Sequence, residues 1–238
     1  MNWSTLGKLC KLVVLAVCAG GVAAVANAQD FNPTELSEVA PDHVEVLFED
    51  EHTALMAVRL APGDSLPEHD GGHRVIYSLS EYVVTHMEDG GSHTQLWKEG
   101  MVHWHDSGRH AVQNTGTTEA RFLVAVCKIL EHEEGPANLE GAALSAVAPE
   151  TTRVILENDD AQVTEVRVPA GGTLPEHGGY YRLVYSQTPY SVTLTVDNGE
   201  QESRTFEPGD VHAHEASKHA LENTGETDAE FLIFAWKL

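Results

Sequence analysis

The sequence has few cysteines and few basic residues. Only 3 of its 238 residues are Cys, and two of these, Cys10 and Cys18, lie in the first 28 residues. A chain that has lost this segment keeps only Cys127, which excludes an intramolecular disulfide. Lys and Arg number 14 against 37 Asp and Glu, a formal net charge of −23. This balance argues against nucleic acid and anionic membrane surfaces as partners.

Long apolar runs are missing after residue 28. Residues 1–28 combine Lys8 and Lys11, an apolar stretch from Leu12 to Ala26, and the small-residue pattern Ala26-Asn27-Ala28. These features are typical of a cleaved secretory signal peptide. An uncleaved membrane anchor is the alternative, but the stretch of about 15 residues is shorter than the roughly 20 that span a bilayer. We therefore expect a periplasmic or secreted protein with no membrane contact after signal removal.

Helical periodicity is also scarce. Outside residues 130–152, no stretch of roughly 12 residues keeps the spacing of an amphipathic helix. Alternating apolar and polar residues are common instead, as in Val44–Phe48 and Tyr190–Val196. Turn residues such as Pro62-Gly63-Asp64 and Asp197-Asn198-Gly199 separate these runs. The pattern predicts an all-β sandwich or barrel.

The chain contains one unit twice, with a period of about 108 residues. Leu66–His69 recurs identically as Leu174–His177, and Gly100–His105 resembles Gly209–His214. The repeat predicts an N-terminal domain at residues 29–129, a linker at 130–152 and a C-terminal domain at 153–238. A short helix is expected within the linker, at Asn138–Val147.

Histidine is unusually frequent, since its 14 copies equal the combined number of Lys and Arg. Four histidines recur at matched positions in both repeats, and imidazole is the commonest metal ligand in proteins. The matched residues are His69, His103, His105 and His110 in the first repeat and His177, His212, His214 and His219 in the second. The other six are expected at the surface or in loops: His43, His52, His73, His86, His93 and His132. His73, close in sequence to His69, could add a ligand to the first site.

The repeated motifs resemble those of the cupin superfamily. Gly63 to His69 and Gly171 to His177 have the opening spacing of the first cupin motif. Gly100, His110 and Asn114, with Gly209, His219 and Asn223, resemble the second motif with one residue fewer before the His. The resemblance implies a bicupin, two RmlC-like jelly-roll barrels in tandem. In many members each barrel holds one metal through three His and one Glu.

This sequence departs from that ligand set in the same way in both repeats. Gly71 and Gly179 stand where the family has its second His, and Arg74 and Arg182 where it has the Glu. An inward-facing Arg would oppose metal binding but suit a carboxylate, whereas an outward-facing one would lie in solvent. Tyr77 and Tyr185 each follow one of these arginines by three residues, and side chains three apart on a strand point to opposite faces. At most one member of each Arg–Tyr pair therefore faces inward.

His103 and His105, like His212 and His214, are two residues apart and share a strand face, so they can replace the missing ligands. An imidazole-only site favours Fe, Zn, Cu or Ni over Mg, Ca or Mn. Three ligands would leave coordination positions open to water or substrate. Alternatively, the barrels have lost metal, and the histidines only form hydrogen bonds in a polar cavity.

The sequence thus predicts an exported bicupin that binds a transition metal through its histidines and acts on a small polar or acidic molecule. The chemistry would be oxygenase-, isomerase- or lyase-like. The residues leave open whether the protein is an enzyme, which would then be a mononuclear, dioxygenase-like metal-dependent oxidoreductase. The alternative is a non-catalytic periplasmic binding module for a small carboxylate or a metal, anchored by Arg74, Arg182, Tyr77 or Tyr185. We expect a monomeric bicupin or a homodimer.

Overall fold

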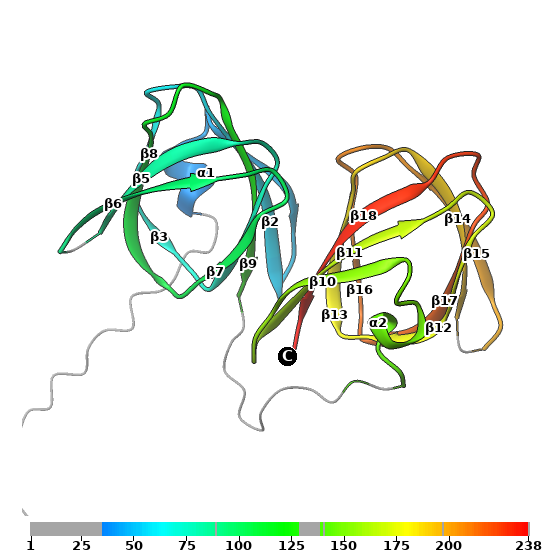
Figure 1. The fold of residues 1–238 in the computed structure, drawn as a ribbon. Coiled ribbons are helices and arrows are strands. Elements are labelled where there is room, and N and C mark those ends of the chain that lie inside the picture. The colour runs from blue at the N-terminus through cyan, green and yellow to red at the C-terminus, as the bar shows by residue number, and fades with distance from the viewer. Residues whose placement is uncertain (1–34, 89, 129–138, 140, 197, 238) are drawn as a thin grey trace, which may run out of the picture. The chain divides into compact units, whose positions relative to one another are not determined.

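The computed structural model describes residues 35–237 except 89, 129–138, 140 and 197 (Figure 1). Almost all of the regular structure in these residues is strand, with two short helices, which confirms the all-β prediction. The predicted export signal and most of the predicted linker lie outside the described residues. No helix among the described residues is long and apolar enough to cross a membrane.

The two repeats contain the same order of elements, a short helix followed by nine strands. The first repeat comprises α1 (Glu35–Val39), β1 (Val44–Glu49), β2 (Thr53–Leu60), β3 (Ser65–Gly71), β4 (Arg74–Ser78), β5 (Tyr82–Glu88), β6 (Gly91–Trp97), β7 (Val102–His105), β8 (Gly108–Asn114) and β9 (Ala120–Cys127). The second comprises α2 (Leu144–Val147), β10 (Thr152–Glu157), β11 (Ala161–Val168), β12 (Thr173–Gly179), β13 (Tyr181–Ser186), β14 (Tyr190–Val196), β15 (Gln201–Phe206), β16 (Val211–His214), β17 (Ser217–Asn223) and β18 (Ala229–Trp236).

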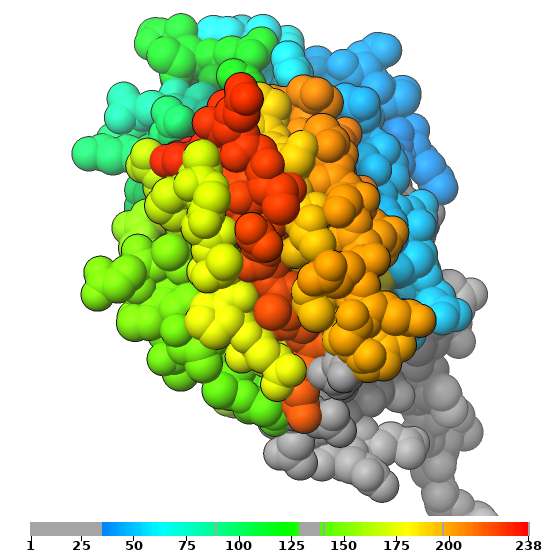
Figure 2. Space-filling view, turned by 90° about the vertical axis from the view of Figure 1, so that its right-hand side faces the viewer, coloured from blue at the N-terminus to red at the C-terminus, as the bar shows by residue number. Residues whose placement is uncertain are grey.

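Each repeat folds into two antiparallel sheets that enclose a core. In the first, a five-stranded sheet of order β1-β2-β9-β4-β7 packs against a four-stranded sheet of order β3-β8-β5-β6. The second repeats this arrangement as β10-β11-β18-β13-β16 and β12-β17-β14-β15. Strands such as β14 alternate between buried and partly exposed residues, as expected when one face of a sheet covers the core. Figure 2 shows the second barrel, with β18 in red between residues coloured green-yellow and orange.

The predicted linker helix is shorter in the structure than the sequence suggests. It covers Leu144–Val147, whereas the prediction began at Asn138, outside the described residues. The preceding backbone uses its hydrogen-bonding groups elsewhere, because the carbonyl of Ala142 accepts a bond from the Gly178 amide and Ala143 forms a bridge with Gly178. Backbone groups that pair with a strand are not available to extend a helix.

Outer-face residues of the two five-stranded sheets form one hydrophobic cluster, in which Leu55, Leu123 and Cys127 of the first repeat join Leu183 and Phe234 of the second. Within this cluster, the indole N–H of Trp236 donates to Oγ1 of Thr53 at 3.0 Å, and both residues are 0% exposed. Burial of apolar surface on both sides of β4 and β13 explains why these short strands are almost entirely buried.

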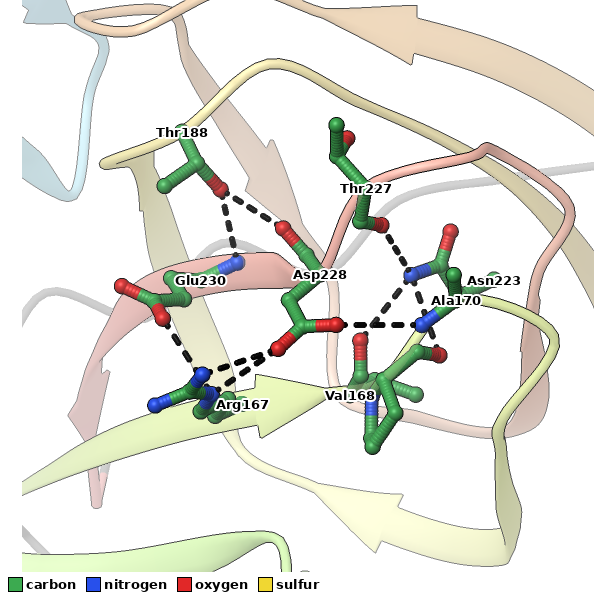
Figure 3. Close-up of polar contacts among 9 residues, drawn as sticks. Arg167, Val168, Ala170, Thr188, Asn223, Thr227, Asp228 and Glu230 are labelled. Atoms are coloured by element: carbon green, nitrogen blue, oxygen red, sulfur yellow. Dashed lines mark hydrogen bonds and ion pairs between the residues drawn. The ribbon is translucent and has the colours of Figure 1, made fainter.

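The asparagine of the second cupin-like motif has a structural role. In the second repeat the Asn223 amide donates to the carbonyls of Val168 and Thr227 (Figure 3). Its Oδ1 accepts from the Gly225 amide. Asp228 joins the same turns by contacting Arg167 and the amide of Ala170 (Figure 3). Asn114 makes the corresponding bonds in the first repeat, to Leu60, Thr118 and Gly116. The asparagine therefore ties together the loops at one end of each barrel.

Candidate ligand-binding cavities

Each barrel encloses a small cavity between its two sheets. The cavity of the first barrel has a volume of about 40 Å³ and that of the second about 30 Å³. Charged residues and histidines lining the first are His69, Asp70, Arg74, His86, His103, His105 and His110, and those lining the second are His177, Arg182, His212, His214 and His219. Since a single water needs roughly 10–15 Å³ measured in this way, each cavity has room for a few waters or a ligand of similar size.

Strand pairing brings the predicted histidines together. His69 on β3 lies opposite His110 on β8, with ring centroids 4.3 Å apart. In the second barrel His177 and His219 are paired in the same way at 4.5 Å. The neighbouring ladder places His105 opposite Arg74. Residues more than thirty positions apart in the chain therefore share each cavity.

Arg74 and Arg182 face inward, which answers the question that strand parity left open. Arg74 is 6% exposed, and its Nη1 donates to the carbonyls of Gly72 at 2.9 Å and Asp106 at 3.2 Å. Its Nη2 lies 3.1 Å from Nε2 of His110. Two loop carbonyls and one imidazole thus fix the position of the guanidinium.

Arg182, at 3% exposure, has the same surroundings in the second barrel. Its Nη1 donates to the carbonyls of Tyr180 and Glu215, and its Nη2 lies 3.0 Å from Nδ1 of His219. The equivalent arrangement in both repeats indicates that the inward arginine is a constant feature of this barrel.

The glycines at the second family His position make room for these arginines. A Cβ added at Gly71 would lie 2.6 Å from Cζ of Arg74 and 2.6 Å from Cε1 of His110. A Cβ at Gly179 would lie 2.6 Å from Cζ of Arg182. Both distances are below van der Waals contact, so any larger residue there would displace the arginine or its neighbours. The two departures from the family pattern therefore depend on each other.

Burial keeps the cavity imidazoles neutral. Burial first, and then the charge of Arg74, lowers the pKa of His110 to about 2 and that of His105 to about 3. Burial and then Arg182 have the same effect on His219 and His214, whose pKa values fall to about 2 and about 3. Burial lowers the pKa of Arg74 only to about 10, so it stays charged at neutral pH. Each cavity therefore contains one cation, the arginine, beside neutral histidines, and the first cavity is also lined by Asp70.

Hydrogen bonds to backbone carbonyls fix the tautomers of the paired histidines in the first barrel. Nδ1 of His69 donates to the Pro67 carbonyl at 2.8 Å, and Nδ1 of His110 lies 3.4 Å from the Gly108 carbonyl. In a neutral imidazole the other nitrogen is then an acceptor. Nε2 of His110 accordingly accepts from Arg74, and the lone pair on Nε2 of His69 is left for another group.

The buried guanidiniums have no carboxylate partner among the described residues. An Arg has five N–H donors, and the contacts of Arg74 use three of them. By contrast, the more exposed Arg153, Arg167 and Arg204 each contact an Asp or Glu through Nε and Nη2. The carboxylates of Glu88 and Asp70 act on Arg74 only through longer-range charge interaction, without an ion pair, and no such carboxylate influence is found for Arg182 among the described residues.

The described residues do not fit the metal site that the family resemblance implies. No group of three or more His, Cys, Asp or Glu side chains within the described part of the chain is arranged as metal ligands. One family His is missing, the Glu has been replaced by a cation, and that cation occupies the adjoining space beside His110. A positive charge within hydrogen-bonding distance of a ligand nitrogen opposes a metal ion at this position.

Tyr77 and Tyr185, named as ligand anchors from the sequence, do not line the cavities. They pack in or against the hydrophobic cluster on the outer face, with the O–H of Tyr77 3.4 Å from Glu165. The reason is strand parity, because each tyrosine lies three residues after an inward-facing arginine. Glu68 and Glu176 are likewise exposed, on the face opposite the paired histidines.

His86 was expected at the surface, and this prediction is wrong. It is 7% exposed and lines the first cavity, because it follows Tyr82 and Val84 on the inward face of β5. Alternation from these two apolar residues was the available sequence clue. His73, proposed as an extra ligand, instead lies against Trp104 and 3.7 Å from Asp106, and it does not line the cavity.

Comparison with solved structures identifies this architecture. AerE from Microcystis aeruginosa superposes with a TM-score of 0.60 over 82% of this chain and 92% of its own, at 14% identity. The oxalate decarboxylase of Bacillus subtilis, a protein with Mn(II) centres, gives a TM-score of 0.57 over 82% of this chain and 72% of its own, at 17% identity. The chain has the bicupin fold.

A third bicupin neighbour is the oxalate decarboxylase of Lactobacillus farciminis in complex with formate. It has a TM-score of 0.57 and 15% identity, over 79% of this chain and 77% of its own. Neither protein-family models nor curated protein sequences match the chain. At these identities the likeness supports the fold, while the function must be argued from the cavities themselves.

Proposed function

We propose that this bicupin binds a small carboxylate in each barrel, with Arg74 and Arg182 as the anchoring groups. The observation that carries this proposal is a buried guanidinium without a carboxylate partner among the described residues, at the same place in both repeats. Burying a charge is unfavourable unless it is paired. A ligand carboxylate supplies the missing charge and matches the planar N–H groups of arginine.

The cavities restrict the ligand to a small anion. Volumes of about 40 and 30 Å³ match a molecule of a few non-hydrogen atoms, such as formate, acetate or oxalate. Nearby neutral histidines, such as His105, can donate an N–H to the second carboxylate oxygen. One structural neighbour is an oxalate decarboxylase in complex with formate. Formate and oxalate both have the size and charge expected of this ligand.

Isothermal titration of the full chain with formate, acetate and oxalate tests the proposal. We expect about two sites for at least one of these anions, one in each barrel. Arg74→Met should remove one site, and Arg74→Met with Arg182→Met should remove both. Lysine at position 74 keeps the charge but loses the planar donor group, so we expect Arg74→Lys to bind more weakly than wild type. Arg153→Met, at the surface, is the matched control.

Failure of all three anions to bind, or unchanged binding in the double variant, would overturn the proposal. Thermal unfolding gives an independent readout, since a ligand at about 100 times its Kd stabilises the folded state by roughly 2.7 kcal/mol. This increase in the free energy of unfolding on adding the anion should disappear in the double variant and persist in Arg153→Met.

A metal-dependent enzyme is the second candidate function. Its support is the gathering of imidazoles in each cavity, in a fold shared with a decarboxylase that has Mn(II) centres. The predicted Fe, Zn, Cu or Ni would then be held by histidines away from the arginine. Metal content measured on purified protein, together with product analysis after incubation with oxalate, separates this candidate from a binding module. Metal-free protein that binds carboxylates without converting them would support the binding module.

We also propose that the chain is exported, on the basis of residues 1–28. Mass spectrometry of the protein recovered from its native compartment should show an N-terminus at Gln29. Intact residues 1–28 would exclude cleavage at this site.

A further inference from the structure

The second barrel has a further pocket beside its cavity, which we call the outer pocket. Its volume is about 120 Å³, against about 30 Å³ for the cavity itself. Four residues line both spaces: Leu144 of α2, His177, Arg182 and Ile233. Since a single water needs roughly 10–15 Å³ in this measure, the outer pocket has room for several more non-hydrogen atoms. A ligand anchored at Arg182 can therefore be larger than the cavity alone allows.

The guanidinium of Arg182 adjoins the outer pocket and has donors to spare. Its Nη1 donates to the carbonyls of Tyr180 and Glu215, and its Nη2 lies beside His219. These contacts use three of the five N–H donors of an arginine. Gly179, which lines the outer pocket, lies directly against this guanidinium. The positive charge of Arg182 is thus close to both spaces.

Neutral polar side chains of β11 line the outer pocket. Gln162 and Thr164 are two residues apart on the strand face that also carries Val166 of the core. Thr164 is 4% exposed, and its hydroxyl makes one long hydrogen bond to a described residue, 3.5 Å to Oε1 of Gln162. Buried hydroxyls usually have closer partners, so a ligand hydroxyl would improve the pairing of Thr164.

The first barrel has an apolar residue where the second has Thr164. The β2–β9 and β11–β18 ladders have the same register, with Met56 opposite Val124 and Thr164 opposite Ile233. Met56 is 1% exposed and lines the first cavity, whose volume is about 40 Å³. A long apolar side chain in the first barrel therefore takes the place of a short hydroxyl side chain in the second. This difference predicts different ligands for the two barrels.

Charge in the outer pocket favours hydroxyls over a second carboxylate in the ligand. Glu157 lines the pocket, and its Oε1 lies 3.0 Å from Nζ of Lys237. Arg182 is the only Lys or Arg among the described residues that line the pocket. A second ligand carboxylate would be repelled by Glu157, whereas a hydroxyl can donate to it. His177 offers another acceptor, because its Nδ1 donates to the Pro175 carbonyl and leaves the lone pair on Nε2.

We propose that the second barrel binds a hydroxy-carboxylate of roughly three to five carbons. The carboxylate contacts Arg182, and the hydroxyl groups lie in the outer pocket, on Thr164 and Gln162. The first barrel, with Met56 at the equivalent position, binds smaller carboxylates without this preference. Because it specifies the ligand of one barrel, this inference rests on the carboxylate binding proposed above.

A series of three-carbon acids tests the preference for hydroxyls. Propionate, lactate and glycerate share one carboxylate and carry none, one and two hydroxyls. Isothermal titration of the full chain with Arg74→Met, in which only the second barrel keeps its anchor, should give affinities that rise in this order. We expect roughly a 2–10-fold gain for each hydroxyl that is bound. Malonate, with a second carboxylate instead, should bind more weakly than glycerate. The chain with Arg182→Met should show no rise along the series.

Substitution of Thr164 tests its contact with the ligand. In the Arg74→Met chain, Thr164→Val keeps the shape of the side chain but removes the hydroxyl, so the preference for glycerate over propionate should fall by roughly 2–10-fold. Thr164→Met introduces the residue of the first barrel and should remove the preference altogether. Thr205→Val, at an exposed position on β15, is the matched control and should keep the preference. Circular dichroism checks the fold of each variant.

The outcomes separate this inference from the proposed function. Acetate binding accompanied by equal affinities for propionate, lactate and glycerate would overturn the inference and leave the proposed function standing. Absence of binding by every carboxylate would overturn both. A preference for glycerate that is unchanged in folded Thr164→Val and Thr164→Met would also overturn the inference, as would tighter binding of malonate than of glycerate. The acid series needs no change at Thr164, so it decides the question even where a Thr164 variant does not fold.

Discussion

The guanidinium of Arg74 occupies space that any side chain at Gly71 would need. The same relationship holds between Arg182 and Gly179. The cupin resemblance implies two metal ligands here, a Glu at the position of each arginine and a His at the position of each glycine. Here the pair supplies a fixed positive charge instead, held by loop carbonyls and by His110 or His219. The proposed carboxylate binding rests on this exchange of two ligands for one cation.

Gly71→Ala tests the fit of the arginine. The added methyl would overlap Arg74 and His110, so we expect a loss of about 1–3 kcal/mol in the free energy of unfolding, the usual effect of overpacking. Weaker carboxylate binding should accompany it. Gly108→Ala is the control, because a Cβ there meets nothing within 4 Å. Urea unfolding measures both, and equal stability of the two variants would show that Arg74 moves aside freely.

Gly71→His combined with Arg74→Glu should create the ligand set that the resemblance implies in the first barrel. His69 and His110 are already paired there, and a carboxylate ligand makes the site suitable for Mn²⁺. We expect about one equivalent of Mn²⁺ in the double variant and none with Arg74→Glu alone, measured by mass spectrometry of metal content. If the double variant folds but takes up no Mn²⁺, restoring these two residues is not sufficient to restore the metal site that the resemblance implies.

Thr53→Val should destabilise the chain because it removes the hydrogen-bond acceptor of the buried Trp236 indole. The hydroxyl of Thr53 accepts from the Trp236 indole at 3.0 Å and donates to the Val126 carbonyl at 2.7 Å, all in buried surroundings. Valine has nearly the same shape, but it leaves a buried N–H unpaired, which costs about 1–3 kcal/mol. Urea unfolding measures the effect, with Thr85→Val, at a partly exposed position, as control. Because Thr53 and Trp236 belong to different repeats, the unfolding of both barrels should be affected.

The neutral histidines make the fold sensitive to acid. The pKa of His219 is about 2 in the folded chain, against roughly 6.5 when unfolded. Between these values the unfolded chain binds a proton that the folded chain does not. The free energy of unfolding therefore falls as pH drops below about 6.5, by up to about 1.4 kcal/mol per pH unit for this residue.

Unfolding of His219→Asn at pH 6, 5 and 4 checks this dependence. The variant should lose stability less steeply than wild type as pH falls, by a difference of up to about 1.4 kcal/mol per pH unit. Ser217→Ala, a neighbouring substitution without a titrating group, should keep the wild-type slope. If the free energy of unfolding falls equally steeply with pH in wild type and His219→Asn, then His219 takes up its proton in the folded chain as readily as in the unfolded chain.

Much of the architecture could be predicted from local sequence patterns. Alternation along Tyr190–Val196 predicted a strand with one buried face, and that strand is β14. The identical Leu66–His69 and Leu174–His177 segments indicated two copies of one fold, and both occupy equivalent strands. Motif spacing also selected His69 and His110 as partners, which the β3–β8 ladder places opposite each other. These features depend on periods and spacings within the chain.

The sequence by itself determined the strands, the repeat and the list of inward-facing candidates, because side-chain alternation along a strand is a local property. Only the tertiary structure decided which face of β4 is enclosed, and hence that Arg74 lies inside while Tyr77 packs outside. It also decided that His86 is buried, because that depends on the sheet packed across from β5. The register shift between Leu66 and His69 is a further feature that no single-strand period reveals. Packing between residues far apart in the chain therefore decided that each arginine points into a cavity and not into solvent.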